Sequence, residues 1–275
     1  MVNFNGSIIS ENELQFSHEN RAFKYGDAIF ETVKIVNNKV VFWEDHYFRL
    51  MASMRMLRMK IPMEFTLEYL ESQILKVLET KEGSTFRARL TVFRKDGGLY
   101  TPKTNEVDFL IDVKAIEVSV KESYRVDLFK DFYNYSGLMS TVKTTNRMLN
   151  TIAAVFAEEN DLDNCILLNE RKGVVEVTNG NIFIVKGTTI KTPALTEGCI
   201  KGVARKKVIE ILEKHPEYTI EQTVISPFEV QKADEVFITN VISGVQIVTN
   251  YRKKEFATEI GQKIGKSLQV KMITG

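Results

Sequence analysis

Within residues 28–57 the spacing of the apolar residues changes once, from a strand pattern to a helical one. Ala28 to Val36 reads as a strand, Asn37-Asn38 as a turn and Lys39 to Phe42 as a returning strand, so this part predicts a β-hairpin. From Trp43 onward the apolar residues recur at helical spacing, and Pro62 closes the segment. The apolar positions of this predicted helix are Tyr47, Leu50, Met51, Met54 and Leu57. The start of the chain therefore predicts a fold that combines helices with sheet.

The rest of the chain continues this mixture and predicts two domains. The predicted strands are residues 86–93, 107–113, 164–169, 173–177, 181–185, 235–238 and 245–248. The predicted helices are residues 67–79, residues 203–213 and a last helix with Ile260, Ile264 and Leu268 on one face. Residues 117–134 have no clear period and are interpreted as an interdomain connection. We therefore expect a small N-terminal domain at residues 1–116 and a larger C-terminal domain at residues 135–275.

Composition excludes several classes of function. The chain has 275 residues, of which 44% are apolar and 27% charged, and this balance is typical of a globular protein. A formal net charge of +1 gives no reason to expect a nucleic-acid or membrane partner. The amino terminus lacks the pattern of a secretion signal, which predicts a cytoplasmic protein. Two cysteines and three scattered histidines predict neither a disulfide scaffold nor a metal site.

Lys143 and Glu176 form the most informative pair in the sequence. Lys143 follows a segment of apolar and small residues and precedes an amphipathic pattern, so we expect it at a strand-to-helix junction. Glu176 opens a second polar stretch further along the chain. A lysine amine can hold an aldehyde cofactor as a Schiff base, and a carboxylate can keep a ring nitrogen protonated. The pair suggests pyridoxal phosphate chemistry, although most lysines are solvated surface groups.

Three other segments are candidates for holding a phosphate. Gly198 to Arg205 places a glycine-flanked turn at a helix start, where backbone N–H groups favour an anion. Thr239 to Gly244 is a polar loop directly after a strand and is equally compatible with an ordinary turn. Arg49 lies three residues after His46, on nearly the same helix face, and its planar fork suits a phosphate. A surface arginine packed along the apolar stripe is the alternative interpretation of Arg49.

Arg87 and Arg89 share one face of the strand predicted at residues 86–93, because side chains alternate along a strand. Two arginines on one face suggest an anion site. The outward polar face of a half-buried sheet is the competing interpretation.

Together these segments resemble the class IV aminotransferase family, the fold-type IV pyridoxal-phosphate enzymes. The family includes branched-chain aminotransferases, D-amino-acid aminotransferases and aminodeoxychorismate lyases. The resemblance covers nearly the whole chain, and its motifs occur in the family's order. They are Tyr25 to Thr32, His46 with Arg49, Lys143 with Asn146, Glu176 with Asn181 and Phe183, Thr192-Pro193, Gly198 to Arg205, and Phe237 to Val248.

The resemblance implies a fold and a role for each motif. The implied fold is α/β (α+β), with a small N-terminal domain, a larger C-terminal domain with a barrel-like β core, and the cofactor between them in a homodimer. It implies that Lys143 binds pyridoxal 5'-phosphate and moves the substrate's α-proton, and that Glu176 contacts the pyridine nitrogen. The implied phosphate ligands are Arg49, Val203, Ala204, Asn240 and Val241. Ala204 departs from the threonine common in the family, so backbone amides must replace a hydroxyl contact.

Substrate choice stays open between related chemistries. Arg147 follows Asn146, as in the aminodeoxychorismate lyases, where branched-chain enzymes commonly carry tyrosine. Leu99 occupies a region where the lyases tend to have a second arginine. We expect Arg89, and secondarily Arg87, to bind the substrate carboxylate, with Phe30 and Arg147 also contacting the substrate. The sequence predicts an amino-acid aminotransferase; the alternatives are aminodeoxychorismate lyase and a non-catalytic homologue that binds the cofactor.

Overall fold

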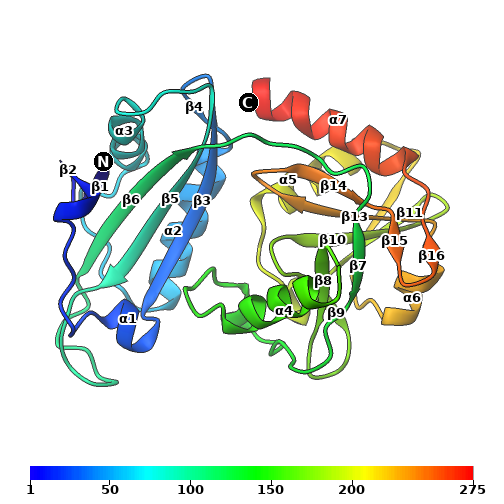
Figure 1. The fold of residues 1–275 in the computed structure, drawn as a ribbon, viewed down its shortest axis with the longest axis horizontal. Coiled ribbons are helices and arrows are strands. Elements are labelled where there is room, and N and C mark those ends of the chain that lie inside the picture. The colour runs from blue at the N-terminus through cyan, green and yellow to red at the C-terminus, as the bar shows by residue number, and fades with distance from the viewer. Residues whose placement is uncertain (275) are drawn as a thin grey trace. The chain divides into compact units, whose positions relative to one another are not determined.

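The computed structural model describes residues 1–274, which form two compact units. The first unit comprises Met1–Glu117 together with Lys143–Asn146, and the second comprises Val118–Val142 together with Arg147–Thr274. Within residues 1–274, no helix is long and apolar enough to cross a membrane, and no cluster of His, Cys, Asp or Glu side chains could hold a metal ion. Each unit has its own sheets and helices (Figure 1).

The first unit is built on a six-stranded sheet in the order β2-β1-β6-β5-β3-β4. Its strands are β1 (Val2–Phe4), β2 (Ser7–Ile9), β3 (Ala28–Val36), β4 (Lys39–Val40), β5 (Thr85–Arg94) and β6 (Val107–Ala115). All neighbouring strands in this sheet run antiparallel. The predicted hairpin is confirmed: Asn37 and Asn38 have φ of 50° and 62°, the left-handed values that a tight two-residue hairpin turn requires.

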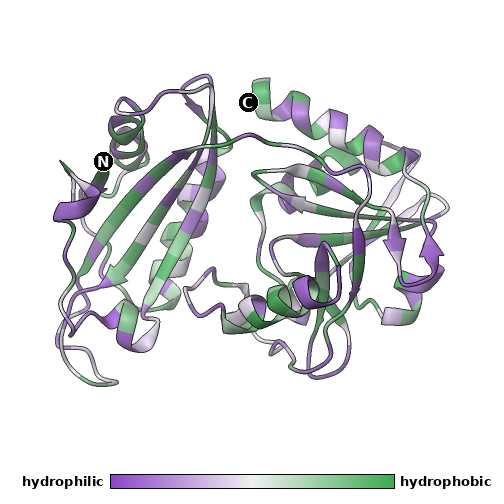
Figure 2. Cartoon of the chain, in the orientation of Figure 1, coloured by the Kyte–Doolittle hydropathy of each residue, from purple (hydrophilic) through white to green (hydrophobic). Residues whose placement is uncertain are grey.

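Helices cover one face of this sheet. They are α2 (Trp43–Met56), which packs on β3, and α3 (Leu67–Leu78), which packs on β6, whereas the short helix α1 (Arg21–Tyr25) contacts β5. Alternate residues of the central strands, such as Val33, Ile35 and Leu90, are fully buried beneath α2 and α3. The residues between them are polar and half-buried, and Figure 2 shows this alternation along the strands. The sheet therefore has an apolar face under the helices and a polar face opposite.

The second unit contains two five-stranded sheets, in the orders β12-β11-β10-β13-β14 and β16-β15-β7-β8-β9. Its strands are β7 (Arg125–Leu128), β8 (Asn164–Leu168), β9 (Val174–Val177), β10 (Asn181–Lys186), β11 (Thr189–Pro193), β12 (Thr219–Thr223), β13 (Glu235–Asn240), β14 (Gly244–Val248), β15 (Asn250–Tyr251) and β16 (Lys254–Glu255). Its helices are α4 (Met148–Glu159), α5 (Val203–Leu212), α6 (Pro227–Lys232) and α7 (Glu259–Thr274). Apolar side chains from both sheets share one core, which includes Ile166, Ile182 and Val236.

Two expectations about local structure are wrong. The segment 117–134 is not irregular throughout, because it contains β7, which pairs in parallel with β8 and β15. The residues before Lys143 form a 3-10 helix, Leu138–Thr141, rather than a strand. The hydroxyls of Ser140 and Thr141 donate to the carbonyls of Tyr135 and Leu138, and such local bonds favour a tight turn over extended backbone.

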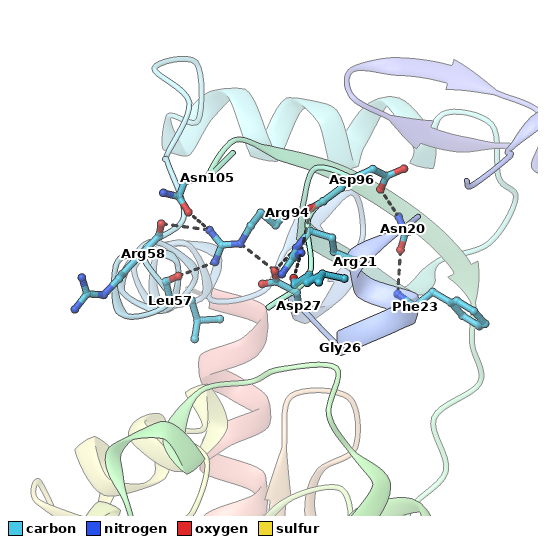
Figure 3. Close-up of polar contacts among 12 residues, drawn as sticks. Asn20, Arg21, Phe23, Gly26, Asp27, Leu57, Arg58, Arg94, Asp96 and Asn105 are labelled. Carbon is cyan, nitrogen blue, oxygen red and sulfur yellow. Dashed lines mark hydrogen bonds and ion pairs between the residues drawn. The ribbon is translucent and has the colours of Figure 1, made fainter. Parts of the chain in front are cut away.

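Asp27 connects the loops of the first unit through two buried arginines (Figure 3). Its Oδ2 accepts from the Nε of Arg21 at 2.8 Å and from the Nε of Arg94 at 2.9 Å. Arg94 also donates to the carbonyl of Leu57 at 2.8 Å, and Arg21 donates to the carbonyl of Leu99 at 2.7 Å. One carboxylate thereby fixes the end of α2 and the loop after β5.

Replacing Asp27 with asparagine should lower the free energy of unfolding of the first unit by roughly 3–5 kcal/mol, because two buried guanidinium groups lose their shared anion. Trp43 is the only tryptophan and is buried in this unit, so its fluorescence during urea unfolding measures the change. The matched control is Asp96→Asn, since Asp96 is exposed and, in the described part of the chain, its side chain accepts only a 3.5 Å bond from Asn20. An equal change in the two variants would contradict the central role of Asp27.

Candidate active site

The segment that carries Lys143 is an extension of the first unit's sheet. Thr144 bridges Ile29 in antiparallel register. The backbone N–H of Phe30 donates to the carbonyl of Lys143 at 2.9 Å, and the N–H of Thr145 donates to the carbonyl of Ala28 at 3.0 Å. These bonds place Lys143 beside the beginning of β3, although more than a hundred residues separate the two in sequence.

Gly26 accommodates this segment because it lacks a side chain. Its φ is 61°, in the left-handed region, and an added Cβ would lie 2.1 Å from Oδ1 of Asn146. The carbonyl of Gly26 also accepts from Asn146 Nδ2 at 3.3 Å and from the Thr145 hydroxyl at 3.2 Å. Both the backbone conformation and the close approach therefore require glycine at this position.

The ring of Phe30 lies against two cations. The Nζ of Lys143 is 4.4 Å from the ring centroid, and the Cζ of Arg89 is 3.7 Å from it. Both distances are within the range of cation–π attraction. The Nε of Arg89 also donates to the hydroxyl of Thr91 at 3.3 Å. The structure thus brings together three residues singled out in the sequence, Lys143, Phe30 and Arg89. Arg87 lies two residues before Arg89, on the same face of β5.

Glu31 lies on the opposite face of β3 and binds the two α2 residues of the predicted phosphate motif. Its Oε1 accepts from the Nε of Arg49 at 2.7 Å and its Oε2 accepts from Nη2 of Arg49 at 2.5 Å. The Nδ1 of His46 lies 2.7 Å from Oε2. Because a carboxylate only accepts, Nδ1 donates, and Nε2 of His46 is a buried acceptor without a hydrogen-bond partner within residues 1–274.

Electrostatics keep this cluster in one charge state. Burial opposes the charge of Glu31, but the Arg49 guanidinium and the His46 bond outweigh it and hold the pKa of Glu31 at about 2. Burial lowers the pKa of His46, and the nearby cations Arg49 and Lys143 lower it further. At neutral pH the cluster therefore consists of an anionic glutamate, a cationic arginine and a neutral histidine.

Glu176 is buried in β9 of the second unit. Its Oε2 accepts from the backbone N–H of Ile200 at 2.9 Å. Ile200 belongs to the turn before α5, and the side chain of Asn181 holds the same turn by donating to the Ile200 carbonyl at 2.9 Å. A Cβ added to Gly202 would lie 2.0 Å from Oδ1 of Asn181, so glycine is required in this turn.

The start of α5 has the properties of an anion site. Among residues 1–274, no side chain caps this helix, whose N-cap residue is Gly202, so none of the amides in its first turn is bonded to a capping side chain there. Val203 and Ala204 are both buried there. Free amides at a helix N-terminus fit a phosphate group. Each unit taken by itself therefore has groups whose chemistry fits pyridoxal phosphate: a lysine amine in the first unit, and a buried carboxylate and an uncapped helix start in the second.

The remaining predicted residues have structural partners. Oδ1 of Asn240 accepts from the amides of Ile242 at 3.0 Å and Ser243 at 2.8 Å, so this side chain shapes the turn that contains Val241. Arg147 precedes α4, and its Nη2 donates to the carbonyl of Val142, the residue before Lys143, at 2.8 Å.

Reasoning from sequence did not identify Glu31 or the bracing contact of Asn181. A signal for Glu31 was present, because Ile29, Val33 and Ile35 make its strand face apolar and Glu31 is the exception. A buried acid requires a partner, and the His46 to Arg49 spacing supplies two.

Comparisons with known protein sequences agree with this geometry. The family model described as amino-transferase class IV matches residues 28–251. A probable branched-chain-amino-acid aminotransferase from Aquifex aeolicus is 30% identical over 97% of this chain and 89% of its own length. An aminodeoxychorismate lyase from Vibrio harveyi is 25% identical, with 90% of each chain covered.

Solved structures show the same fold. The crystal structure of a branched-chain aminotransferase from Thermoproteus uzoniensis with norvaline has a TM-score of 0.89 and 22% identity, covering 98% of this chain and 93% of that one. A second branched-chain enzyme, crystallised with pyridoxamine 5'-phosphate, has a TM-score of 0.88 and 21% identity, covering 98% of this chain and 92% of its own. This likeness confirms the predicted α/β fold class.

Replacing Glu31 with glutamine should lower the free energy of unfolding at pH 7 by roughly 3 kcal/mol, because the pKa of Glu31 is held far below its ordinary value. A lowered pKa in the folded state stabilises the protein above about pH 4.5, and this stabilisation is lost as pH falls toward 2. The difference in free energy of unfolding between the wild type and Glu31→Gln, measured by Trp43 fluorescence, should therefore become smaller below pH 4.5.

The control for this experiment is Glu82→Gln, an exposed loop carboxylate of the same unit. It should change the free energy of unfolding by less than about 0.5 kcal/mol. If the difference in free energy of unfolding between the wild type and Glu31→Gln stays constant from pH 6 to pH 3, the charge of Glu31 does not stabilise the fold.

Proposed function

The chain belongs to the class IV aminotransferase family, and from that membership we propose that it is a pyridoxal-phosphate-dependent amino-acid aminotransferase. The observation that carries the proposal is the position of Lys143, whose amine lies 4.4 Å from the centre of the Phe30 ring, the same ring that the guanidinium of Arg89 contacts at 3.7 Å. A reactive amine and a carboxylate-binding arginine against one aromatic ring are what an enzyme of amino acids and oxo acids needs.

Pyridoxal phosphate, when bound, supplies an aldehyde that amines can attack and a ring that accepts electrons from a carbanion. Lys143 would hold this aldehyde, and its amine would move the proton of the substrate's α-carbon. Glu176, fixed by the Ile200 amide, is an anion suited to keep a ring nitrogen protonated. Lys143 would thus serve proton transfer, and Glu176 would serve charge stabilisation.

Phosphate binding is assigned to Arg49 and to the amides of Val203 and Ala204. Glu31 holds two nitrogens of the Arg49 guanidinium, so the side chain is fixed in one orientation. The turn at Asn240 and Val241 is the second source of amides. Ala204 lacks a hydroxyl, and the N–H groups of the first turn of α5 would therefore carry the larger share of the anion's hydrogen bonds.

A second candidate function is aminodeoxychorismate lyase, which releases pyruvate. It is favoured by Arg147, which follows the lysine motif and is anchored to the carbonyl of Val142, and by the likeness to the Vibrio harveyi enzyme. Both reactions begin with loss of the α-proton to Lys143 and differ in the later steps.

We also propose that the enzyme is a cytoplasmic homodimer, which size-exclusion chromatography and cell fractionation would test.

Replacing Lys143 with alanine should abolish the visible absorbance that the purified wild-type protein develops with pyridoxal phosphate, and should lower turnover roughly 10²- to 10⁴-fold. Absorbance spectra and amino-group transfer measure the two effects. Lys253→Ala, a change at an exposed lysine, serves as the control and should behave as the wild type. A wild-type protein that stays colourless with the cofactor would remove the enzyme hypothesis.

The reaction outcome can be separated by product. With branched-chain amino acids and 2-oxoglutarate, an aminotransferase should produce glutamate, and with aminodeoxychorismate a lyase should produce pyruvate. We expect glutamate to form at least tenfold faster than pyruvate, which corresponds to a difference of about 1.4 kcal/mol in activation free energy. Pyruvate as the dominant product would replace the first proposal with the second.

A further inference from the structure

A cavity of about 230 Å³ lies within the second unit, on the outward face of β7 and β15. Asn250 pairs with Arg125 in the parallel register of these strands, so the two side chains point to the same face. The residues that follow them, Tyr251 and Val126, are buried in the core on the opposite face. The lining of this β7 cavity includes Arg125, Asp127, Asn250, Arg252, Phe156 and Leu162.

Two hydrogen-bond donors of the β7 cavity have no acceptor within residues 1–274. The guanidinium of Arg125 forms no hydrogen bond, ion pair or ring contact there, although the backbone N–H of Arg125 donates to Asp163. Asn250 accepts from the Thr249 hydroxyl at 2.8 Å through Oδ1, and its Nδ2 donates to no described group. Neighbouring strands lie about 5 Å apart, so one carboxylate can accept from both side chains.

Arg125 is the uncompensated charge of the β7 cavity. Asp127 is the one acid among the described residues of the lining, and its Oδ1 already accepts from Nε of Arg252 at 2.9 Å. Asp163, beside the Arg125 backbone, is paired with the Lys121 amine at 2.6 Å. Because both acids have their own cations, one positive charge is left in excess, and a monoanion would neutralise it.

The opposite wall of the β7 cavity is apolar and is held in place by the core. Phe156 and Leu162 are half-buried and pack against the hydrophobic cluster that contains Cys165. The ring of Phe156 also meets the ring of Phe129 edge to face, with 5.6 Å between their centroids. An apolar chain that lies against this wall would leave water without any rearrangement of the wall.

The C-terminal end of α4 lies at the same wall, and free carbonyls at a helix end disfavour an anion. Here the carbonyl of Phe156 accepts from Nδ2 of Asn160 at 2.8 Å, and the carbonyl of Ala157 accepts from the amide of Leu162 at 2.9 Å. These carbonyls are already bonded, so they oppose an anion less than free ones would.

We propose that the β7 cavity binds a small organic monocarboxylate with a short apolar chain. Its carboxylate accepts from Arg125 and Asn250, and its chain lies against Phe156 and Leu162. One liquid water occupies about 30 Å³, so the cavity holds a ligand of roughly eight non-hydrogen atoms. This site is separate from every residue assigned above to the cofactor or the substrate, and the inference does not depend on the proposed aminotransferase function.

Hexanoate has this size and chemistry and is the probe. In isotope-labelled holoenzyme, it should shift the backbone amide NMR signals of residues 125–127 and 250–252, with a Kd on the order of 1 mM. The position of these residues in β7 and β15 distinguishes this binding from binding at the cofactor. Hexanol lacks the charge and acetate lacks the chain, so each should bind at least about tenfold more weakly.

Arg125→Gln should raise the Kd for hexanoate roughly tenfold to hundredfold, the range of one charged hydrogen bond. The matched control is Lys253→Gln, because Lys253 is exposed and lies next to Arg252 but does not line the cavity. It removes the same charge and should leave the Kd within about twofold. Both variants replace exposed residues, so a folding defect would be visible as a lowered Tm without hexanoate.

Asn250→Asp provides a second variant of nearly the same shape. It keeps the oxygen that accepts from Thr249 but replaces the amide donor with a negative charge, so it should raise the Kd for hexanoate at least about tenfold.

Three results would overturn the inference. The first is the absence of amide shifts in β7 and β15 at about ten times the expected Kd. The second is an equal loss of affinity in Arg125→Gln and Lys253→Gln, which would assign binding to overall charge. The third is equal affinity for hexanoate and hexanol, which would leave the carboxylate without a role.

Discussion

Two backbone hydrogen bonds join residues 143–145 to the start of β3, and the arrangement around Lys143 depends on them. They fix the lysine in register with Phe30, so its amine has a defined neighbour. Arg89 then reaches the same ring from β5, the next strand of the sheet. Backbone bonds of this kind have a stronger geometric requirement than side-chain contacts, because each donor has one preferred direction. The backbone of Lys143 is thus positioned as precisely as that of a residue within a strand.

The two units contribute different kinds of electrostatic control. In the first unit, carboxylates hold the charged side chains: Glu31 fixes Arg49, and Asp27 fixes Arg21 and Arg94. In the second unit, backbone amides are the main electrostatic groups, at the Ile200 contact to Glu176 and at the uncapped start of α5. Amides hold a weaker charge but need no counter-ion and cannot change protonation state. Binding of an anion through amides therefore does not depend on the protonation of the protein, whereas binding through titratable side chains does.

Sequence patterns identified the parts of the fold that local interactions determine. The β3–β4 hairpin and α2 were predicted from Asn37-Asn38 and from the helical spacing after Trp43, because turn chemistry and hydrophobic period act over a few residues. β7 was missed because its four residues are stabilised by parallel pairing with distant strands, which leaves no local period. The extended segment expected before Lys143 was replaced by a 3-10 helix for the opposite reason: short side-chain bonds prevailed over apolar composition. Lys143 itself was found, but its pairing with β3 joins distant parts of the chain and has no local signal.

The docking of residues 143–146 on β3 also has a consequence for biosynthesis. A ribosome that has released residues 1–117 has released nearly all of the first unit, yet the beginning of β3 still has an open edge there. That edge is covered only after the chain has been extended past residue 146, when Thr144 can bridge Ile29. Exposed strand edges are where nascent chains pair with one another. Truncation at the apparent end of the first unit would make this open edge permanent, so the first unit is contiguous in space but not in the order of synthesis.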